Sequence, residues 1–186
     1  KNLSGDKLQA FKKKLGTTVH RDFKRLLASE KRAVIETRND YIGGTGKELM
    51  SDERVVTFRM MRGQLVIDFD ITFIASYGDV EIGDMKDAGL SVRIPSSMSL
   101  KSEMGGKIVN SEGVRDGDTW SKRAAWVDYH GPVDGEHLGI AILNHPDSFR
   151  YPTPWHVRTY GLFTANPFGF KSLDETLEDA SFTLID

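Results

Sequence analysis

Residues Gln64–Ala75 carry the clearest pattern in the chain, a strict alternation of apolar and polar side chains. Five apolar residues share one face: Leu65, Ile67, Phe69, Ile71 and Phe73. Successive side chains of a strand point to opposite sides, so this pattern predicts a β-strand with one buried face. A second β-prone run, Arg54–Met61, precedes it across Arg62-Gly63, and the pair predicts a hairpin.

Other β-prone runs recur at short spacing along the chain. They are Thr17–Phe23, Ala33–Arg38, Leu90–Ile94, Lys107–Asn110, Ala124–Tyr129, Leu138–Leu143, Val157–Phe163 and Ser181–Ile185. Helical spacing is confined to residues 1–16, where Leu3, Leu8, Phe11 and Leu15 lie as on one helix face. The sequence therefore predicts an all-β protein, an antiparallel β-sandwich with a short N-terminal helix at most. No linker or repeat divides residues 1–186, so we expect a single domain.

Composition limits the partners of such a domain. The 186 residues include 39% hydrophobic and 28% charged residues, typical of a soluble globular protein. A net charge of −2 argues against a nucleic-acid partner. No apolar run approaches the roughly 20 residues that span a bilayer, so no membrane partner is expected. The chain lacks cysteine, which removes disulfides and thiolate metal ligands but leaves the compartment open among periplasmic, secreted and cytoplasmic.

The stretch Tyr151–Gly169 mixes aromatic, basic and proline residues in a way that no simple strand requires. Pro152 and Pro154 restrict the backbone before Trp155 to an extended conformation. Period two then places His156, Arg158 and Tyr160 on one face. Such a face can bind an anionic or polyhydroxylated ligand, and a histidine can act as general acid or base near neutral pH. Alternatively, Arg158 and Tyr160 pair within the sandwich and His156 is a satisfied core residue.

Two segments before this stretch offer carboxylates, cations and aromatic faces. The turn Asn110–Gly113 carries Glu112, and Trp120–Trp126 carries Lys122 and Arg123. Aromatic and charged groups together suit sugar rings, because the ring takes the apolar face and the charges take the hydroxyls. Alternatively, Trp126 is a core residue and Lys122 is exposed.

Histidines and aspartates near the end of the predicted hairpin Ala124–Tyr129/Leu138–Leu143 allow a different chemistry. His145 and His156 with Asp128 or Asp147 would form a His/carboxylate metal site. The spacing does not match a His-Glu-x-x-His motif, and the alternative is that His145 and Asp147 cap a turn.

Five segments resemble the PmoA-like family of bacterial proteins, also called "methane oxygenase PmoA". They are Gly83–Arg93, Gly106–Gly113, Trp120–Tyr129, Gly139–Pro146 and Pro154–Gly169. The resemblance implies a β-sandwich like the galactose-mutarotase supersandwich and carbohydrate-related work. It also implies an upstream His-rich segment and a further strand. We therefore expect this chain to be a fragment of a longer family domain, with a second copy or the missing segment covering its sheet edges.

Together these expectations describe a carbohydrate-active protein, an enzyme acting on a sugar or oxidised sugar with isomerase, epimerase or lyase chemistry. His156 is the expected acid/base, with Glu112 or Asp128 as its carboxylate partner. The expected substrate-binding residues are Arg158, Tyr160, Trp155, Trp126, Lys122, Arg123, Lys86 and Asn166. No cofactor is expected. The alternatives are a non-catalytic glycan- or protein-binding module and a metal-dependent oxygenase, as the family name suggests.

Overall fold

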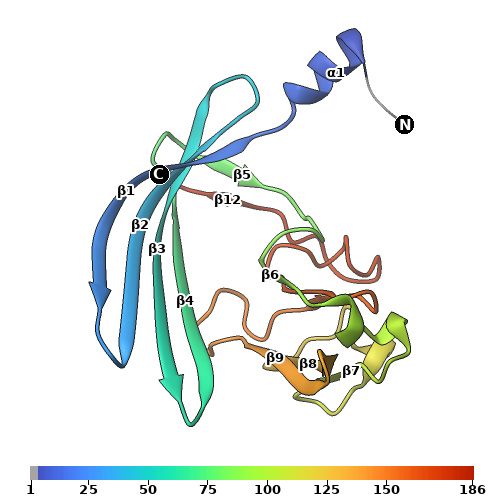
Figure 1. The fold of residues 1–186 in the computed structure, drawn as a ribbon. Helices are drawn as coiled ribbons and strands as arrows, with labels where there is room; N and C mark the ends of the chain where they lie inside the picture. The colour runs from blue at the N-terminus through green and yellow to red at the C-terminus, as the bar shows by residue number, and fades with distance from the viewer. Residues whose placement is uncertain (1–3) are drawn as a thin grey trace. The chain divides into compact units, whose positions relative to one another are not determined.

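The computed structural model describes residues 4–186, which form antiparallel sheets and one short α-helix (Figure 1). The predicted all-β class is confirmed, and so is the short helix, although Leu3 of its predicted face lies outside the described residues. The chain divides into two compact units. Unit 1 runs to Glu81 and also includes Thr183–Asp186, and unit 2 is Ile82–Phe182. The grouping of residues 1–186 into one domain stays a prediction.

Unit 1 contains helix α1 (Gly5–Lys12) and a four-stranded sheet of order β1-β2-β3-β4. The strands are β1 (Thr17–Ala28), β2 (Arg32–Ile42), β3 (Glu48–Met61) and β4 (Gln64–Ile74), which lie side by side in Figure 1. Arg62 and Gly63 join β3 to β4 with φ values of 53° and 80°, and Met61 pairs with Gln64. The predicted hairpin is confirmed. A turn with two positive φ values matches strand twist and favours glycine.

The middle of this sheet is polar rather than apolar. Asp52 is fully buried and accepts hydrogen bonds from Asn39 at 2.7 Å and from the Tyr41 hydroxyl at 2.6 Å. The guanidinium of Arg54 also donates to the Asp52 carboxylate, at 2.6 Å. A buried carboxylate keeps its charge only with such partners.

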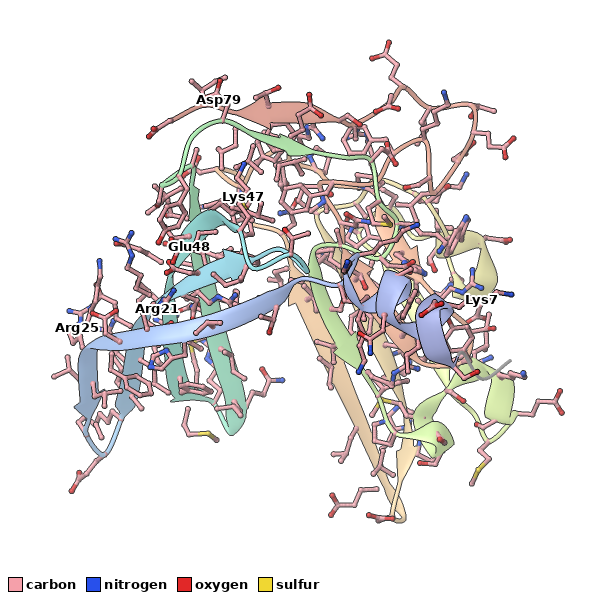
Figure 2. The ribbon with its side chains drawn as sticks, turned by 90° about the horizontal axis from the view of Figure 1, so that it is seen from above. Lys7, Arg21, Arg25, Lys47, Glu48 and Asp79 are labelled. Carbon is pink, nitrogen blue, oxygen red and sulfur yellow. The ribbon has the colours of Figure 1, made fainter. Side chains whose placement is uncertain are left out.

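On the other face of the sheet, Arg21 of β1 links β1 to β2 and β3 by ion pairs. Its guanidinium contacts buried Asp40 at 2.5 Å and Glu48, at the start of β3, at 3.1 Å. Figure 2 labels Arg21 and Glu48 on two strands of this sheet. The apolar face predicted for residues 64–75 is exposed near the β3–β4 turn. Leu65 is 60% exposed there and Ile67 50%.

Unit 2 is a small β-sandwich. One sheet has the order β10-β11-β6, with β10 (Trp155–Val157), β11 (Leu162–Ala165) and β6 (Leu90–Arg93), and the other has the order β7-β8-β9, with β7 (Lys107–Asn110), β8 (Trp126–Val133) and β9 (Glu136–Leu143). Ile108, Tyr129 and Ile142 from one sheet and Trp155 and Phe163 from the other share one core.

β5 (Val80–Ile82) pairs with β12 (Phe182–Leu184), and Val80, Glu81, Thr183 and Leu184 of this pair belong to unit 1. Three 3-10 helices lie in the connections between the strands of unit 2, at Ser96–Met98, Leu100–Ser102 and Asp116–Thr119. The Tyr129 hydroxyl anchors one of these connections, since it accepts from the Leu100 amide at 2.9 Å and donates to the Thr159 carbonyl at 3.0 Å.

The prediction of one strand over Val157–Phe163 is wrong. The structure has two antiparallel strands there, β10 and β11, joined by a tight turn in which the Arg158 amide donates to the Leu162 carbonyl at 2.8 Å. Gly161 makes the turn possible with a φ of 99°, which L side chains rarely adopt. The turn decides where Arg158 and Tyr160 lie.

Candidate functional site

The loop Gly83–Gly89 lies beside His156 and is held by Asn166, the residue that follows β11. The Asn166 side chain is fully buried, and its amide nitrogen donates to the carbonyl oxygens of Met85 and Lys86, both at 3.0 Å. Its amide oxygen accepts from the Phe168 backbone at 3.0 Å. Asn166, predicted as a substrate contact, therefore positions the loop that carries Lys86 and Asp87.

His156 of β10 lies against this loop. It is 3% exposed, and its Nδ1 lies 2.5 Å from the Lys86 carbonyl oxygen. A carbonyl only accepts, so Nδ1 carries the proton and Nε2 is the unprotonated nitrogen of the neutral ring. No residue of the described range 4–186 hydrogen-bonds to Nε2. The Trp120 ring meets the imidazole edge-on at 4.9 Å between centroids.

Arg158 contacts two aromatic rings, and one of them, Trp120, also contacts His156. Its Cζ atom is 4.7 Å from the Trp120 centroid and 5.3 Å from that of Tyr160. Arg93 of β6 approaches Tyr160 as well, at 5.8 Å. Neither arginine forms a salt bridge with a carboxylate among the residues that the structure describes. Tyr160 is 43% exposed, so the cluster reaches the surface.

Asp87 is the carboxylate of this cluster. It pairs with Lys86 at 2.8 Å, and its Oδ1 lies 3.8 Å from His156 Nδ1. The hydrogen bond from Lys86 lowers the pKa of Asp87; burial opposes this, and the charges of Lys86, His156 and Arg158 add to the lowering. One carboxylate among the permanent cations Lys86, Arg93 and Arg158 leaves the cluster electropositive.

Trp120, which contacts both His156 and Arg158, is held by the C-terminal segment of unit 2. Its indole nitrogen donates to the Leu173 carbonyl at 3.1 Å. Asp84 fixes that segment, since its carboxylate accepts from the amides of Phe170 at 3.0 Å, Ser172 at 2.8 Å and Ala180 at 2.8 Å. Burial raises the pKa of Asp84, but these hydrogen bonds outweigh burial and hold it well below its usual range.

The structure corrects the role predicted for Trp155. Its side chain is fully buried in the sandwich core, and its indole nitrogen donates to the Ala124 carbonyl at 2.9 Å. On a strand, Trp155 and His156 point to opposite sides, and the side of Trp155 is the core. Trp155 therefore has no face for a sugar, and Trp120 is the aromatic residue beside His156.

The predicted carboxylate partners of His156 lie elsewhere. Asp128 is on β8 and binds His130 Nδ1 at 2.7 Å. Glu112 is exposed in a turn and accepts from the Ser111 hydroxyl at 2.9 Å. Neither carboxylate contacts His156 among residues 4–186, where Asp87 is the acidic neighbour of that ring.

The remaining predicted contacts are not gathered at His156. Arg123 donates to the Pro152 carbonyl at 2.7 Å and lies 4.4 Å from the Phe170 ring, so it supports the proline-rich arm. Lys122 is exposed, and its charge helps lower the pKa of Asp174, after the hydrogen bonds from Thr176. Trp126 is half-buried at the start of β8.

The alternative metal site is not formed in the described part of the chain. His145 is an exposed turn residue whose Nδ1 accepts from the Asp147 amide at 3.2 Å, so the turn-capping alternative is the one the structure contains. Residues 4–186 hold no group of three or more His, Asp or Glu side chains arranged to bind a metal ion.

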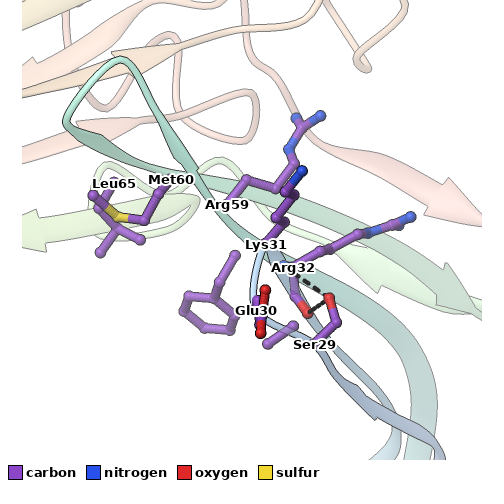
Figure 3. Close-up of a pocket in the computed structure, with 9 residues that line it drawn as sticks. Ser29, Glu30, Lys31, Arg32, Arg59, Met60 and Leu65 are labelled. Atoms are coloured by element: carbon purple, nitrogen blue, oxygen red, sulfur yellow. Dashed lines mark hydrogen bonds between the residues drawn. The ribbon is translucent and has the colours of Figure 1, made fainter.

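Unit 1 carries a separate, shallow pocket of about 130 Å³ (Figure 3). Its lining is Ser29, Glu30, Lys31, Arg32, Ala33, Phe58, Arg59, Met60 and Leu65. The Ser29 hydroxyl there bonds the Arg32 backbone, which closes the β1–β2 turn. These hydrogen bonds belong to the β1–β2 turn itself, and the predicted site residues lie in unit 2.

Sequence reasoning missed Trp120, Asp87 and Arg93 as members of the cluster. Both Trp120 and Asp87 lie in segments that the sequence analysis had singled out, two residues from Lys122 and next to Lys86 respectively. Arg93 ends a β-prone run, and nothing local marks it as a neighbour of Tyr160.

The geometry defines an all-β protein whose second unit presents cations and aromatic rings around a histidine of fixed tautomer. The chain belongs to DUF6807, a family of unknown function, which it matches over residues 4–184. No curated protein and no solved structure matches it. Within residues 4–186, no helix is both long and apolar enough to cross a bilayer.

Proposed function

We propose that unit 2 binds a sugar or oxidised sugar at the cluster of Lys86, Asp87, Trp120, His156, Arg158 and Tyr160. The contacts of Arg158 with the Trp120 and Tyr160 rings, at 4.7 and 5.3 Å, carry this proposal. A guanidinium held by two rings is pre-organised to bind a carboxylate with two parallel hydrogen bonds. The excess of cations favours an acidic sugar over a neutral one.

His156 is the proposed acid/base. Its Nδ1 proton is committed to the Lys86 carbonyl, so Nε2 is the atom that accepts a proton from a bound sugar. Asp87, 3.8 Å from Nδ1, stabilises the imidazolium that results. An isomerisation, epimerisation or elimination needs a group of this kind beside an acidic C–H bond.

Proton NMR of wild type with neutral sugars and uronic acids tests the catalytic form of the proposal. We expect conversion of at least one uronic acid, reduced about 10²–10⁴-fold in His156→Ala, the usual contribution of a general acid or base. His145→Ala is the control, because His145 lies in an exposed turn. Conversion by His156→Ala at the wild-type rate contradicts the assignment.

A second candidate is a non-catalytic glycan- or protein-binding module. The 3% exposure of His156 favours it, because a base needs access to its substrate. Binding without conversion of any sugar in the same NMR experiment selects this candidate. The metal-dependent oxygenase gains no support from residues 4–186, which gather no set of three metal ligands.

We also propose that this DUF6807 member is a PmoA-like protein. The five matching segments between residues 83 and 169 support the proposal, and they include the loop of Lys86 and the strand of His156.

A further inference from the structure

A second cluster of titratable side chains lies on the sheet β7-β8-β9, on the strand pair β8–β9. His130 of β8 pairs with Gly139, and Pro132 pairs with His137 of β9. Residues two apart on a strand share a face, so His130 and His137 are diagonal neighbours on one side of the sheet. Their rings lie 5.3 Å apart between centroids.

Asp128, two residues before His130 on the same face, fixes the orientation of this imidazole. Its carboxylate lies 2.7 Å from His130 Nδ1, so this nitrogen is the donor and Nε2 keeps a free lone pair. A carboxylate holding the far nitrogen is the arrangement that metal-binding histidines commonly have. Gly139, opposite His130, leaves room for the side chains of His130 and Asp128. A Cβ atom at this position would lie 2.9 Å from the His130 Cβ and 3.3 Å from an Asp128 oxygen.

We propose that His130 and His137 bind one late first-row divalent metal ion, with Asp128 as the positioning residue. The His130 side chain is 29% exposed, and His137 is exposed. Within residues 4–186, His137 has no hydrogen bond that would occupy its nitrogens. Imidazole suits Cu²⁺, Ni²⁺ and Zn²⁺, and the general order of affinities places Cu²⁺ first. Water completes the coordination, because the described residues supply no third ligand.

Calorimetric titration of the full chain with CuCl2, repeated with MgCl2, tests this site. We expect about one Cu²⁺ ion per chain and no Mg²⁺ binding, because Mg²⁺ prefers oxygen ligands. Asp128→Asn weakens Cu²⁺ binding about 10–100-fold, the usual effect of removing a carboxylate that orients a metal-binding imidazole. His130→Ala and His137→Ala each weaken it further, and His145→Ala leaves it unchanged.

Electron paramagnetic resonance of the Cu²⁺ complex gives an independent measurement. Two imidazole nitrogens coupled to copper in wild type, and one in His137→Ala, support the site. If His130→Ala is poorly folded by circular dichroism, His130→Gln replaces it. Cu²⁺ binding in both histidine variants equal to wild type overturns the proposal, and so does Mg²⁺ binding as tight as that of Cu²⁺.

Discussion

His156 Nδ1 donates a hydrogen bond to the backbone carbonyl of Lys86 at 2.5 Å, across 70 positions of sequence. Asn166 donates to the same oxygen at 3.0 Å. One carbonyl thus fixes both the tautomer of the imidazole and the position of the loop that carries Asp87. Hydrogen bonds to the Lys86 carbonyl therefore hold both the proposed acid/base and the loop whose Asp87 carboxylate lies 3.8 Å from His156 Nδ1.

Replacing Asn166 by alanine releases this loop. The Met85 carbonyl and the Phe168 amide lose this hydrogen bond in a buried setting, whereas the Lys86 carbonyl keeps its bond from His156. We expect the free energy of unfolding to fall by about 1–3 kcal/mol, the cost of removing a hydrogen-bond partner from buried polar groups. Urea denaturation measures it. Asn144→Ala, which removes an acceptor from the Thr153 amide, is the control and should cost less. Equal losses in the two variants would contradict this role.

Asp84→Asn weakens the segment that holds Trp120, because an amide replaces a carboxylate bound by several backbone amides. A loss of about 2–3 kcal/mol at neutral pH is expected, since hydrogen bonds to charged groups contribute about 1.5–3 kcal/mol. Amide hydrogen exchange at Leu173 and Ala180 should speed up. Unchanged exchange there would count against Asp84 as the anchor.

Acid has a matching effect in wild type. The pKa of Asp84 is depressed in the folded state, so its stabilisation is complete above the unfolded pKa, near 4, and is lost as pH falls through the folded value. The unfolding free energy of Asp84→Asn should therefore depend less on pH below about 4 than that of wild type. Parallel acid profiles would show that Asp84 does not carry the effect.

The hairpins were predictable because local chemistry decides them. Arg62-Gly63 needs two positive φ values, and the alternating run after it fixes the strand register. The break between Val157 and Leu162 was missed, because the residues on both sides of Tyr160-Gly161 are β-prone and read as one strand. The turn is revealed only by the φ of 99° at Gly161 in the structure. Boundaries of this kind depend on packing against β6, which no local pattern contains.

Gly161→Ala tests that turn. The new methyl group would lie 2.9 Å from Ile94 Cγ1, which is a clash. The alanine would also have to adopt the φ of 99°, which strains its backbone. We expect a loss of about 1–3 kcal/mol in thermal or urea unfolding. Gly105→Ala is a matched control, since its φ is 105° and nothing lies within 4 Å of the added atom. The difference between the two variants measures the clash, and no difference would show that Ile94 yields freely.

Tyr41 makes unit 1 sensitive to alkali. Burial, followed by the hydrogen bond to Asp52, raises the pKa of Tyr41 to about 12. A raised folded pKa means that stability is complete below the unfolded value, near 10, and is lost as pH rises toward the folded one. Tyr41→Phe should cost about 1–3 kcal/mol at neutral pH, because Asp52 loses a donor.

The same variant should show a shallower fall of unfolding free energy above pH of about 10, measured by urea denaturation across pH. Tyr77→Phe is the comparison, since Tyr77 is 42% exposed and donates to Asp40 at 3.1 Å. If the unfolding free energy of Tyr41→Phe falls with pH as steeply as that of wild type, Tyr41 is not the group that makes unit 1 sensitive to alkali.

Residue types near the site could be predicted from the sequence, but their partners could not. Period two placed Trp155 and His156 on opposite faces, and the sequence does not say which face is the core. The structure buries Trp155 and brings Trp120, 36 positions from His156, against the imidazole. Asp128 has a histidine two residues away on its own strand, and that local pair takes the place of the predicted contact with His156.

Calorimetric titration with D-galacturonate and D-galactose, in wild type, Arg158→Met and Arg115→Met, tests the proposed site most directly. Arg115 is an exposed arginine of the same unit and serves as the control. We predict tighter binding of the uronic acid than of the neutral sugar, lost about 10–100-fold in Arg158→Met, as for one charge-assisted hydrogen bond, and kept in Arg115→Met. Equal affinity for the two sugars, or unchanged affinity in Arg158→Met, would contradict a site built around Arg158 and His156.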